Sequence, residues 1–205
     1  MNIKLTNVGK RFNREWIFRN LDFEFRSGSS YAITGPNGSG KSTLLQIISG
    51  ATTFNEGSIE YYIADKKIEE EKVYNHISIA APYLELVEEM TLTEFLEFHA
   101  KLKKWLPEFD AKKIISVINL NAAATKQIRY FSSGMKQRVK LAIAVFSNVP
   151  VILLDEPITN LDEEGIALYK NLSKDYCASR MLIISSNDKQ EYDFCDEVLD
   201  VKDFK

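Results

Sequence analysis

Cysteine is scarce in this chain of 205 residues, and long apolar runs are absent. Its two cysteines, Cys177 and Cys195, have no C-x-x-C spacing and no histidine cluster nearby, so neither a disulfide framework nor a zinc site is indicated. This favours a reducing, cytoplasmic compartment. No apolar run reaches the roughly 18 residues that a spanning helix needs, and the N-terminus lacks the apolar core of a signal peptide. We therefore expect any role at a membrane to depend on a partner chain.

An excess of positive charge is also missing. The chain has 26 lysines and arginines against 29 aspartates and glutamates, which gives a formal net charge of −3. A nucleic-acid surface would show clustered basic side chains, so we expect no nucleic-acid partner. The hydrophobic content of 45% is enough to bury a full core, either as one domain or as a core with one inserted subdomain.

The chain does contain a glycine-rich phosphate-binding pattern, G-x-x-x-x-G-K-S, at residues 35–42. The pattern lies between an apolar strand-like run and an apolar helix-like run, as such a loop requires. Its glycines let backbone N–H groups turn inward around an anion at a helix N-terminus. Lys41 adds a positive charge near the β- and γ-phosphates, and Ser42 offers a hydroxyl to Mg²⁺. The residues predicted to bind a nucleoside triphosphate are Gly35, Pro36, Asn37, Gly38, Ser39, Gly40, Lys41, Ser42 and Thr43.

Two adjacent carboxylates follow a second apolar run. Residues 151–154 are all apolar, as expected for a buried parallel strand, and Asp155 and Glu156 stand at its carboxyl end, where ligands bind in such sheets. Asp155 suits a Mg²⁺ ion held through water. Glu156 suits a general base that polarises the attacking water. The sequence thus predicts hydrolysis of the nucleotide as well as its binding.

Alternating apolar residues open the chain. Residues 3–25 indicate short strands in an antiparallel β flap ahead of the phosphate loop, and residues 57–63 and 77–81 indicate further strands. The apolar run at 181–186 is predicted to be the last buried strand. Phe12 lies in the flap, where its ring can stack on an adenine or can equally be an ordinary core or edge residue.

The pattern becomes helical in the middle of the chain. A helix is predicted to open near Thr91 with a threonine cap and to extend its apolar stripe to Trp105, and a second helix is expected over 110–120. We therefore predict an α/β fold in which a helical subdomain, residues 85–147, is inserted into the core. The predicted core with its flap covers residues 1–84 and 148–205.

In order and spacing these motifs resemble the ATP-binding cassette of ABC transporters, over essentially the whole chain. The similar segments are residues 35–43 for Walker A, 151–156 for Walker B with its catalytic glutamate, 160–162 for the D-loop and 131–135 for the LSGGQ signature. The resemblance implies a P-loop NTPase core with a mainly parallel sheet. It also implies that two cassettes stack head to tail around ATP, with Ser132 and Gly134 facing the γ-phosphate bound by the partner.

The same resemblance implies partners and a location. The chain would form a homodimer, or a heterodimer with a second cassette, across the nucleotides. The pair would sit on an integral-membrane transporter subunit at the inner face of the cell membrane. Residues 83–90 are apolar enough to dock that subunit, although they could equally form a buried hinge between subdomains.

Three regions depart from the family pattern. Pro82 stands where the family has its Q-loop glutamine, Ser133 and Met135 replace signature residues, and Asn187 replaces the switch histidine. An asparagine amide donates a hydrogen bond but carries no charge and takes no proton. We therefore expect slow hydrolysis, with Glu156 and Asn187 as the catalytic residues.

Three classes of function stay open on the sequence. The chain powers a transporter, or it is a soluble cassette that acts as an ATP-gated clamp or regulator, or it is a nucleotide sensor without useful hydrolysis. Soluble cassettes of the family usually occur in tandem or carry long insertions, which favours transport here. Pro82 and Asn187 favour the sensor, whereas Glu156 speaks against it. A GTPase is disfavoured because the guanine-reading N-K-x-D is absent.

Overall fold

The computed structural model describes all residues from Met1 to Lys205, and they fall into two compact units. The sheet unit comprises residues 1–79, 149–156 and 178–205, and the helical unit comprises residues 80–148 and 157–177. The boundaries expected from the sequence stay a prediction. The two units differ from that prediction chiefly at residues 157–177, which group with the helices rather than with the sheets.

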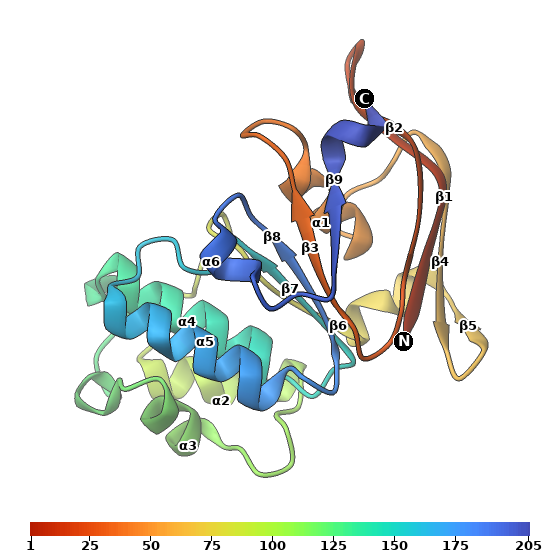
Figure 1. The fold of residues 1–205 in the computed structure, drawn as a ribbon. Helices are drawn as coiled ribbons and strands as arrows, with labels where there is room; N and C mark the ends of the chain where they lie inside the picture. Colours follow the sequence, from red (N-terminus) through yellow and green to blue (C-terminus); the bar gives the residue numbers. More distant parts are fainter. The chain divides into compact units, whose positions relative to one another are not determined.

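The first sheet of the sheet unit is the antiparallel flap (Figure 1). Its strands are β1 (Asn2–Phe12), β2 (Glu15–Phe25), β4 (Glu56–Ile63) and β5 (Lys66–Ile68), in the order β2-β1-β4-β5. Apolar and polar residues alternate along these strands, as expected for a sheet with one buried face. Ile3 and Leu5 of β1 and Phe25 of β2 are buried, while their neighbours in the sequence are not. The predicted antiparallel flap is confirmed, with two long strands in place of several short ones.

The second sheet has the strand order β6-β7-β8-β3-β9. Its strands are β3 (Ser30–Thr34), β6 (Ile77–Ala80), β7 (Val151–Asp155), β8 (Met181–Ser185) and β9 (Glu197–Asp200). The pairs β7·β8, β8·β3 and β3·β9 are parallel, so the predicted parallel core is confirmed. Helix α1 (Lys41–Ile48) follows β3 and packs its Leu44 and Ile47 into the same hydrophobic cluster as Leu153 and Ile183. The short helix α6 (Lys189–Tyr192) follows β8.

Strand β8 is the last buried strand, as predicted, but one further strand was not predicted. Strand β9 follows β8 and pairs with β3 at the edge of the sheet. An edge strand buries little, and in β9 only Leu199 is buried while Val198 is 58% exposed. Its sequence therefore lacks the continuous apolar run that marks β7 and β8.

The helical unit contains α2 (Leu92–Leu102), α3 (Ala111–Val117), α4 (Ser133–Phe146) and α5 (Glu163–Tyr176). Polar side chains cap the first turns of these helices, and the capping residues are Thr91, Asp110, Ser132 and Asp162. Helix α2 ends at Leu102, so Trp105 does not continue its stripe as predicted. Trp105 instead pairs with Ser147 in an isolated antiparallel bridge. No helix of the structure is both long and apolar enough to cross a membrane.

A half-buried histidine joins α2 to the end of α4. The His99 ring stacks on Trp105 with ring centroids 4.8 Å apart, and its Nε2 lies 3.1 Å from the hydroxyl of Ser147. Burial lowers the pKa of His99 from 6.5 to about 4, and the charge of Lys103 acts in the same direction. His99 is therefore neutral in the folded protein at physiological pH.

This histidine predicts a loss of stability in mild acid. The unfolded chain takes up the His99 proton near pH 6.5 and the folded chain only near pH 4. The free energy of unfolding therefore falls as the pH drops through this window, by roughly 3 kcal/mol at most. Urea denaturation followed by circular dichroism, at several pH values, measures this free energy. His99→Gln should flatten the pH dependence in this window, and an equally steep dependence in that variant would contradict the assignment.

Candidate nucleotide site

The phosphate-binding loop joins the end of β3 to the start of α1. Gly40 precedes the helix with φ 103°, a left-handed conformation that glycine adopts without strain. A Cβ atom on Gly40 would also overlap the side chain of Ile17 on β2, so any other residue here would force that side chain to move. The flap therefore packs directly against the loop and holds its shape.

Lys41 is buried within the loop and only 5% exposed. Its Nζ donates hydrogen bonds to the carbonyl oxygens of Gly35, at 2.9 Å, and Pro36, at 3.4 Å. The remaining predicted loop residues lie in the same turn, with Ser39 donating its backbone N–H to Pro36 at 3.0 Å. The fixed positive charge is therefore held at the loop, where the sequence predicted it.

Asp155 lies at the carboxyl end of β7, level with the end of β3. Strand register pairs Asp155 with Ser185 of β8, and Ser185 with Ile33 of β3. Asp155 is 2% exposed, and its Oδ1 atom has no hydrogen-bond partner. Burial raises the pKa of Asp155, and the hydroxyls of Ser185 and Ser42 act in the opposite direction. A buried carboxylate oxygen without a partner, beside a serine hydroxyl, is an environment that fits a divalent cation with a preference for oxygen ligands.

Glu156 directly follows Asp155 in a strained conformation. Its φ is +44°, which is uncommon for a residue with a side chain. The backbone N–H of Glu156 donates to the carbonyl oxygen of Ser185 at 2.9 Å, and this bond fixes the turn at the end of the strand. Strained backbone of this kind concentrates at functional sites, where the surrounding structure holds it in place.

Asn187 follows β8 and reaches the phosphate loop. Its Nδ2 donates a hydrogen bond of 2.9 Å to Oδ1 of Asn37, 150 positions earlier in the chain. The backbone of this segment is tied to β3 as well, because Ser186 donates its N–H to Ile33 at 3.1 Å. The structure thus brings together Asn187 and the loop, two parts of the site that the sequence predicted separately.

Phe12 lies at the tip of the flap, where β1 turns into β2. It pairs with Glu15 across the turn and is 53% exposed, so it is not a core residue. The ammonium of Lys10 lies 4.9 Å from the centre of its ring. An exposed ring at this position is free to stack on a base, and its contact with adenine stays a prediction.

The signature segment belongs to the helical unit. The side chain of Ser132 caps α4 by accepting a hydrogen bond of 3.2 Å from the backbone N–H of Met135. Gly134 lies in the first turn, where a Cβ atom would stand 2.9 Å from the carbonyl oxygen of Asn160. The start of α4 therefore packs tightly against the residues that resemble the D-loop, and only glycine permits that approach.

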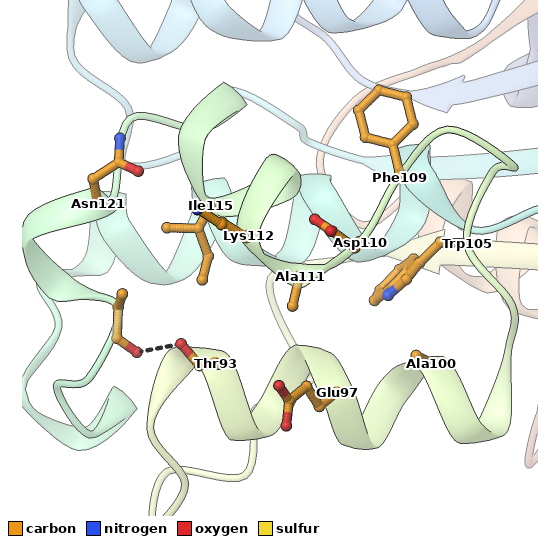
Figure 2. A pocket seen from close by; sticks show the side chains of 11 residues that line it. Thr93, Glu97, Ala100, Trp105, Phe109, Asp110, Ala111, Lys112, Ile115 and Asn121 are labelled. Atoms are coloured by element: carbon orange, nitrogen blue, oxygen red, sulfur yellow. Dashed lines mark hydrogen bonds between the residues drawn. The ribbon is translucent and has the colours of Figure 1, made fainter.

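A separate cavity of about 660 Å³ lies in the helical unit, beside α2 and the segment that leads into α3 (Figure 2). Figure 2 shows Trp105, Ala111 and Ile115 facing this space from one side, with Glu97 and Ala100 on α2 opposite. None of the residues predicted to bind the nucleotide lines it. The cavity is therefore not part of the nucleotide site.

Two features of the site were missed on the sequence. The first is Ser185, whose hydroxyl faces Asp155 and whose carbonyl holds Glu156. Its position directly after the apolar residues 181–184 was the available signal. The second is the bond between Asn37 and Asn187, which depends on the order of strands in the sheet and leaves no mark in the sequence.

A parallel sheet with a phosphate-binding loop after one strand and two carboxylates after another defines the class of P-loop nucleoside triphosphatases. Comparison with known proteins gives the family. The model of the ABC transporter family matches residues 18–159. The chain belongs to this family, and it is an ATP-binding subunit with ATPase activity.

Individual relatives agree with this placement. The ABC transporter ATP-binding protein YybJ of Bacillus subtilis is 30% identical over 97% of this chain and 92% of its own length. The phosphonates import ATP-binding protein PhnC of Fusobacterium nucleatum is 30% identical over 80% of this chain and 72% of its own length. A solved dimeric structure of the bacterial ABC transporter cassette MJ0796 matches with a TM-score of 0.76 and 25% identity, over 97% of this chain and 94% of that one.

Proposed function

We propose that this chain hydrolyses Mg·ATP slowly, as one half of a cassette dimer that drives an integral-membrane transporter subunit. One observation carries the proposal. Lys41, Asp155, Glu156 and Asn187 all lie at the carboxyl ends of β3, β7 and β8, the edge at which ligands bind in parallel sheets. The sheet unit thereby holds a positive charge that can bind phosphate, an oxygen ligand for a cation and a carboxylate that can act as a base.

Each residue has a distinct role in this proposal. The backbone N–H groups of residues 35–43 and the charge of Lys41 bind the phosphates, and the exposed ring of Phe12 stacks on adenine. Ser42 and Asp155 would hold Mg²⁺, which would neutralise charge on the phosphate oxygens. The chain has no cluster of three or more histidine, cysteine, aspartate or glutamate side chains that would hold a metal alone. A cation bound jointly with the nucleotide is consistent with that donor set.

Glu156 acts as the general base toward the attacking water. Its carboxylate accepts a proton from the water, which makes the oxygen a better nucleophile toward the γ-phosphorus. Asn187 donates a hydrogen bond to the γ-phosphate through Nδ2. In this structure the same atom donates to Asn37. An amide is a neutral donor, so it positions a group without contributing charge. This difference is the physical reason to expect slow turnover.

The second half of the site comes from a second cassette in this proposal. Ser132 and Gly134 lie at the N-terminus of α4, where free backbone N–H groups favour an anion. In a head-to-tail pair they face the γ-phosphate held by the partner chain. The partner is a second copy of this chain or a related cassette. The loop at residues 83–90, with Tyr83 and Val87 both exposed, docks the membrane subunit and places the pair at the inner face of the membrane.

A sensor that binds ATP without useful turnover is the competing function, and Asn187 is the observation that favours it. Asn187→His separates the two. A histidine restores a donor that also carries charge, so we expect phosphate release to rise, by less than the roughly 10²–10⁴-fold that a positioned proton-transfer group contributes. Steady-state phosphate release at saturating Mg·ATP measures the change, with Asn187→Ala as the control without a donor. A lower rate in Asn187→His than in the wild type would contradict the assigned role of position 187.

A further inference from the structure

The loop at residues 81–90 is fastened to the helical unit at its second half by backbone bonds. Arg129 donates its N–H to the carbonyl oxygen of Glu88 and Ile128 donates to that of Met90, each at 3.0 Å. The side chain of Gln127 donates to the carbonyl oxygen of Glu89 at 2.9 Å. These bonds fix the end of the loop that leads into α2.

The first half of the loop is fastened by Lys140 of α4 instead. Nζ of Lys140 donates to the carbonyl oxygen of Pro82 at 2.8 Å and to that of Ala81 at 3.3 Å. One turn earlier on the same face of the helix, Lys136 forms an ion pair with Glu88. A cavity of about 410 Å³ between loop and helix is lined by these same lysines together with Glu85 and other residues of the loop.

Position 82 is a proline where the family has a glutamine, and Lys140 provides the side-chain hydrogen bond that holds this segment. Proline has no backbone N–H and no polar side chain, so its carbonyl oxygen is the only group of that residue that can form a hydrogen bond. A charged donor makes a stronger bond to a carbonyl than a neutral one does. Burial lowers the pKa of Lys140, with the charge of Lys136 acting in the same direction, so the ammonium is partly withdrawn from water. The two carbonyl oxygens replace part of that lost hydration.

Lys140 also belongs to the helix that begins with the signature segment. Helix α4 runs from Ser133 to Phe146 and buries Val139, Leu141 and Ala142. A helix packed in this way moves as a rigid element. A displacement at its N-terminus is therefore carried to Lys140, two turns along.

We propose that Lys140 is a positioning residue that ties loop 81–90 to α4, so that engagement of the signature segment with ATP moves the loop. In this chain Lys140 of the signature helix α4 positions the loop by binding its backbone carbonyl oxygens. A glutamine side chain at position 82 is not available for this role. The inference rests on the proposed function, in which the signature meets the nucleotide of a partner cassette and the loop docks the membrane subunit.

Hydrogen exchange measured by mass spectrometry tests this tie in the full chain. The parent protein is Glu156→Gln, compared with and without Mg·ATP. The parent is measured alone and with each of three further substitutions, Lys140→Met, Lys140→Arg and Lys170→Met. Lys170 lies on the exposed face of α5 and serves as the control. Without ATP, we expect exchange of the Leu84 amide, which donates to the carbonyl oxygen of Ala81, to be at least about tenfold faster in Lys140→Met, because the charged hydrogen-bond donor to that same turn is lost. Lys140→Arg keeps a charged donor and should retain much of the protection, and Lys170→Met should match the parent.

The response to ATP gives the second readout. In the parent, Mg·ATP should slow exchange both at residues 133–137 and at the loop. In Lys140→Met the response at 133–137 should persist, while the response at the loop is lost. If the loop keeps its response in Lys140→Met, the inference is overturned.

The outcomes also separate this inference from the proposed function. If residues 133–137 of the parent do not respond to Mg·ATP, the head-to-tail dimer fails. Exchange without ATP then still tests whether Lys140 holds the loop, because unchanged protection of the loop in Lys140→Met would overturn the inference. Should Lys140→Met not fold by circular dichroism, Lys140→Ala, which also removes the hydrogen-bond donor, takes its place with the same expected results.

Discussion

Lys41→Ala is expected to weaken the binding of Mg·ATP by at least about a hundredfold, or roughly 2.7 kcal/mol. In the structure the Lys41 ammonium is held at the loop by the carbonyl oxygens of Gly35 and Pro36. It is the only charged side chain that the loop itself contributes. Charge-assisted hydrogen bonds to phosphate are about twice as strong as neutral ones, and alanine removes them together with the charge. Backbone N–H groups of the loop remain, so weak residual binding is expected.

Titration calorimetry of wild type and variant measures this loss. Wild-type affinity is expected in the micromolar to millimolar range, about −8 to −4 kcal/mol. Because Lys41 also ties the loop in the free protein, Lys41→Met, which retains most of the side-chain volume, accompanies the alanine variant. Lys170→Ala on exposed α5 is the matched control for loss of one positive charge and should bind as the wild type does. Unchanged affinity in Lys41→Ala would refute the phosphate-binding role of the loop.

Glu156→Gln is expected to trap a dimer with ATP bound, which is the second large effect. Glutamine has the same shape as glutamate but cannot accept the proton of the attacking water. The strained turn at position 156 is held by a backbone bond to Ser185, so the substitution should leave the fold unchanged. Two nucleotides then stay enclosed between two cassettes, because the step that opens the dimer no longer occurs.

Light scattering with excess Mg·ATP measures the mass of this species. The variant should double its mass with Mg·ATP and remain a monomer with Mg·ADP. Glu163→Gln, an exposed carboxylate in the first turn of α5, is the matched control and should not trap a dimer. A Glu156→Gln protein that stays monomeric at saturating Mg·ATP would count against the head-to-tail arrangement.

The parts of this fold that were predictable from the sequence are those with strong local patterns. The apolar runs of β3 and β7 are long enough to identify buried strands, and each is followed directly by a polar motif. Lys41, Asp155 and Glu156 could therefore be assigned to one edge of the sheet from the sequence alone. The cap of α2 was equally readable, because Thr91 carries the hydroxyl that a first turn requires.

What could not be predicted depends on contacts between distant segments. Strand β9 was missed because an edge position leaves only Leu199 buried. Trp105 was assigned to α2 because its spacing continues the stripe, whereas its ring stacks on His99 after the helix has ended. The bonds made by Lys140 go to backbone oxygens 58 and 59 positions away, which no side-chain pattern can reveal.

Steady-state phosphate release at saturating Mg·ATP decides whether this cassette hydrolyses ATP with Glu156 as its base. Wild type, Glu156→Gln and a blank without protein are measured side by side. We expect slow release from the wild type, clearly above the blank, and release from Glu156→Gln that cannot be distinguished from the blank. A wild-type rate already equal to that of Glu156→Gln would contradict the account and leave the chain as a sensor of ATP.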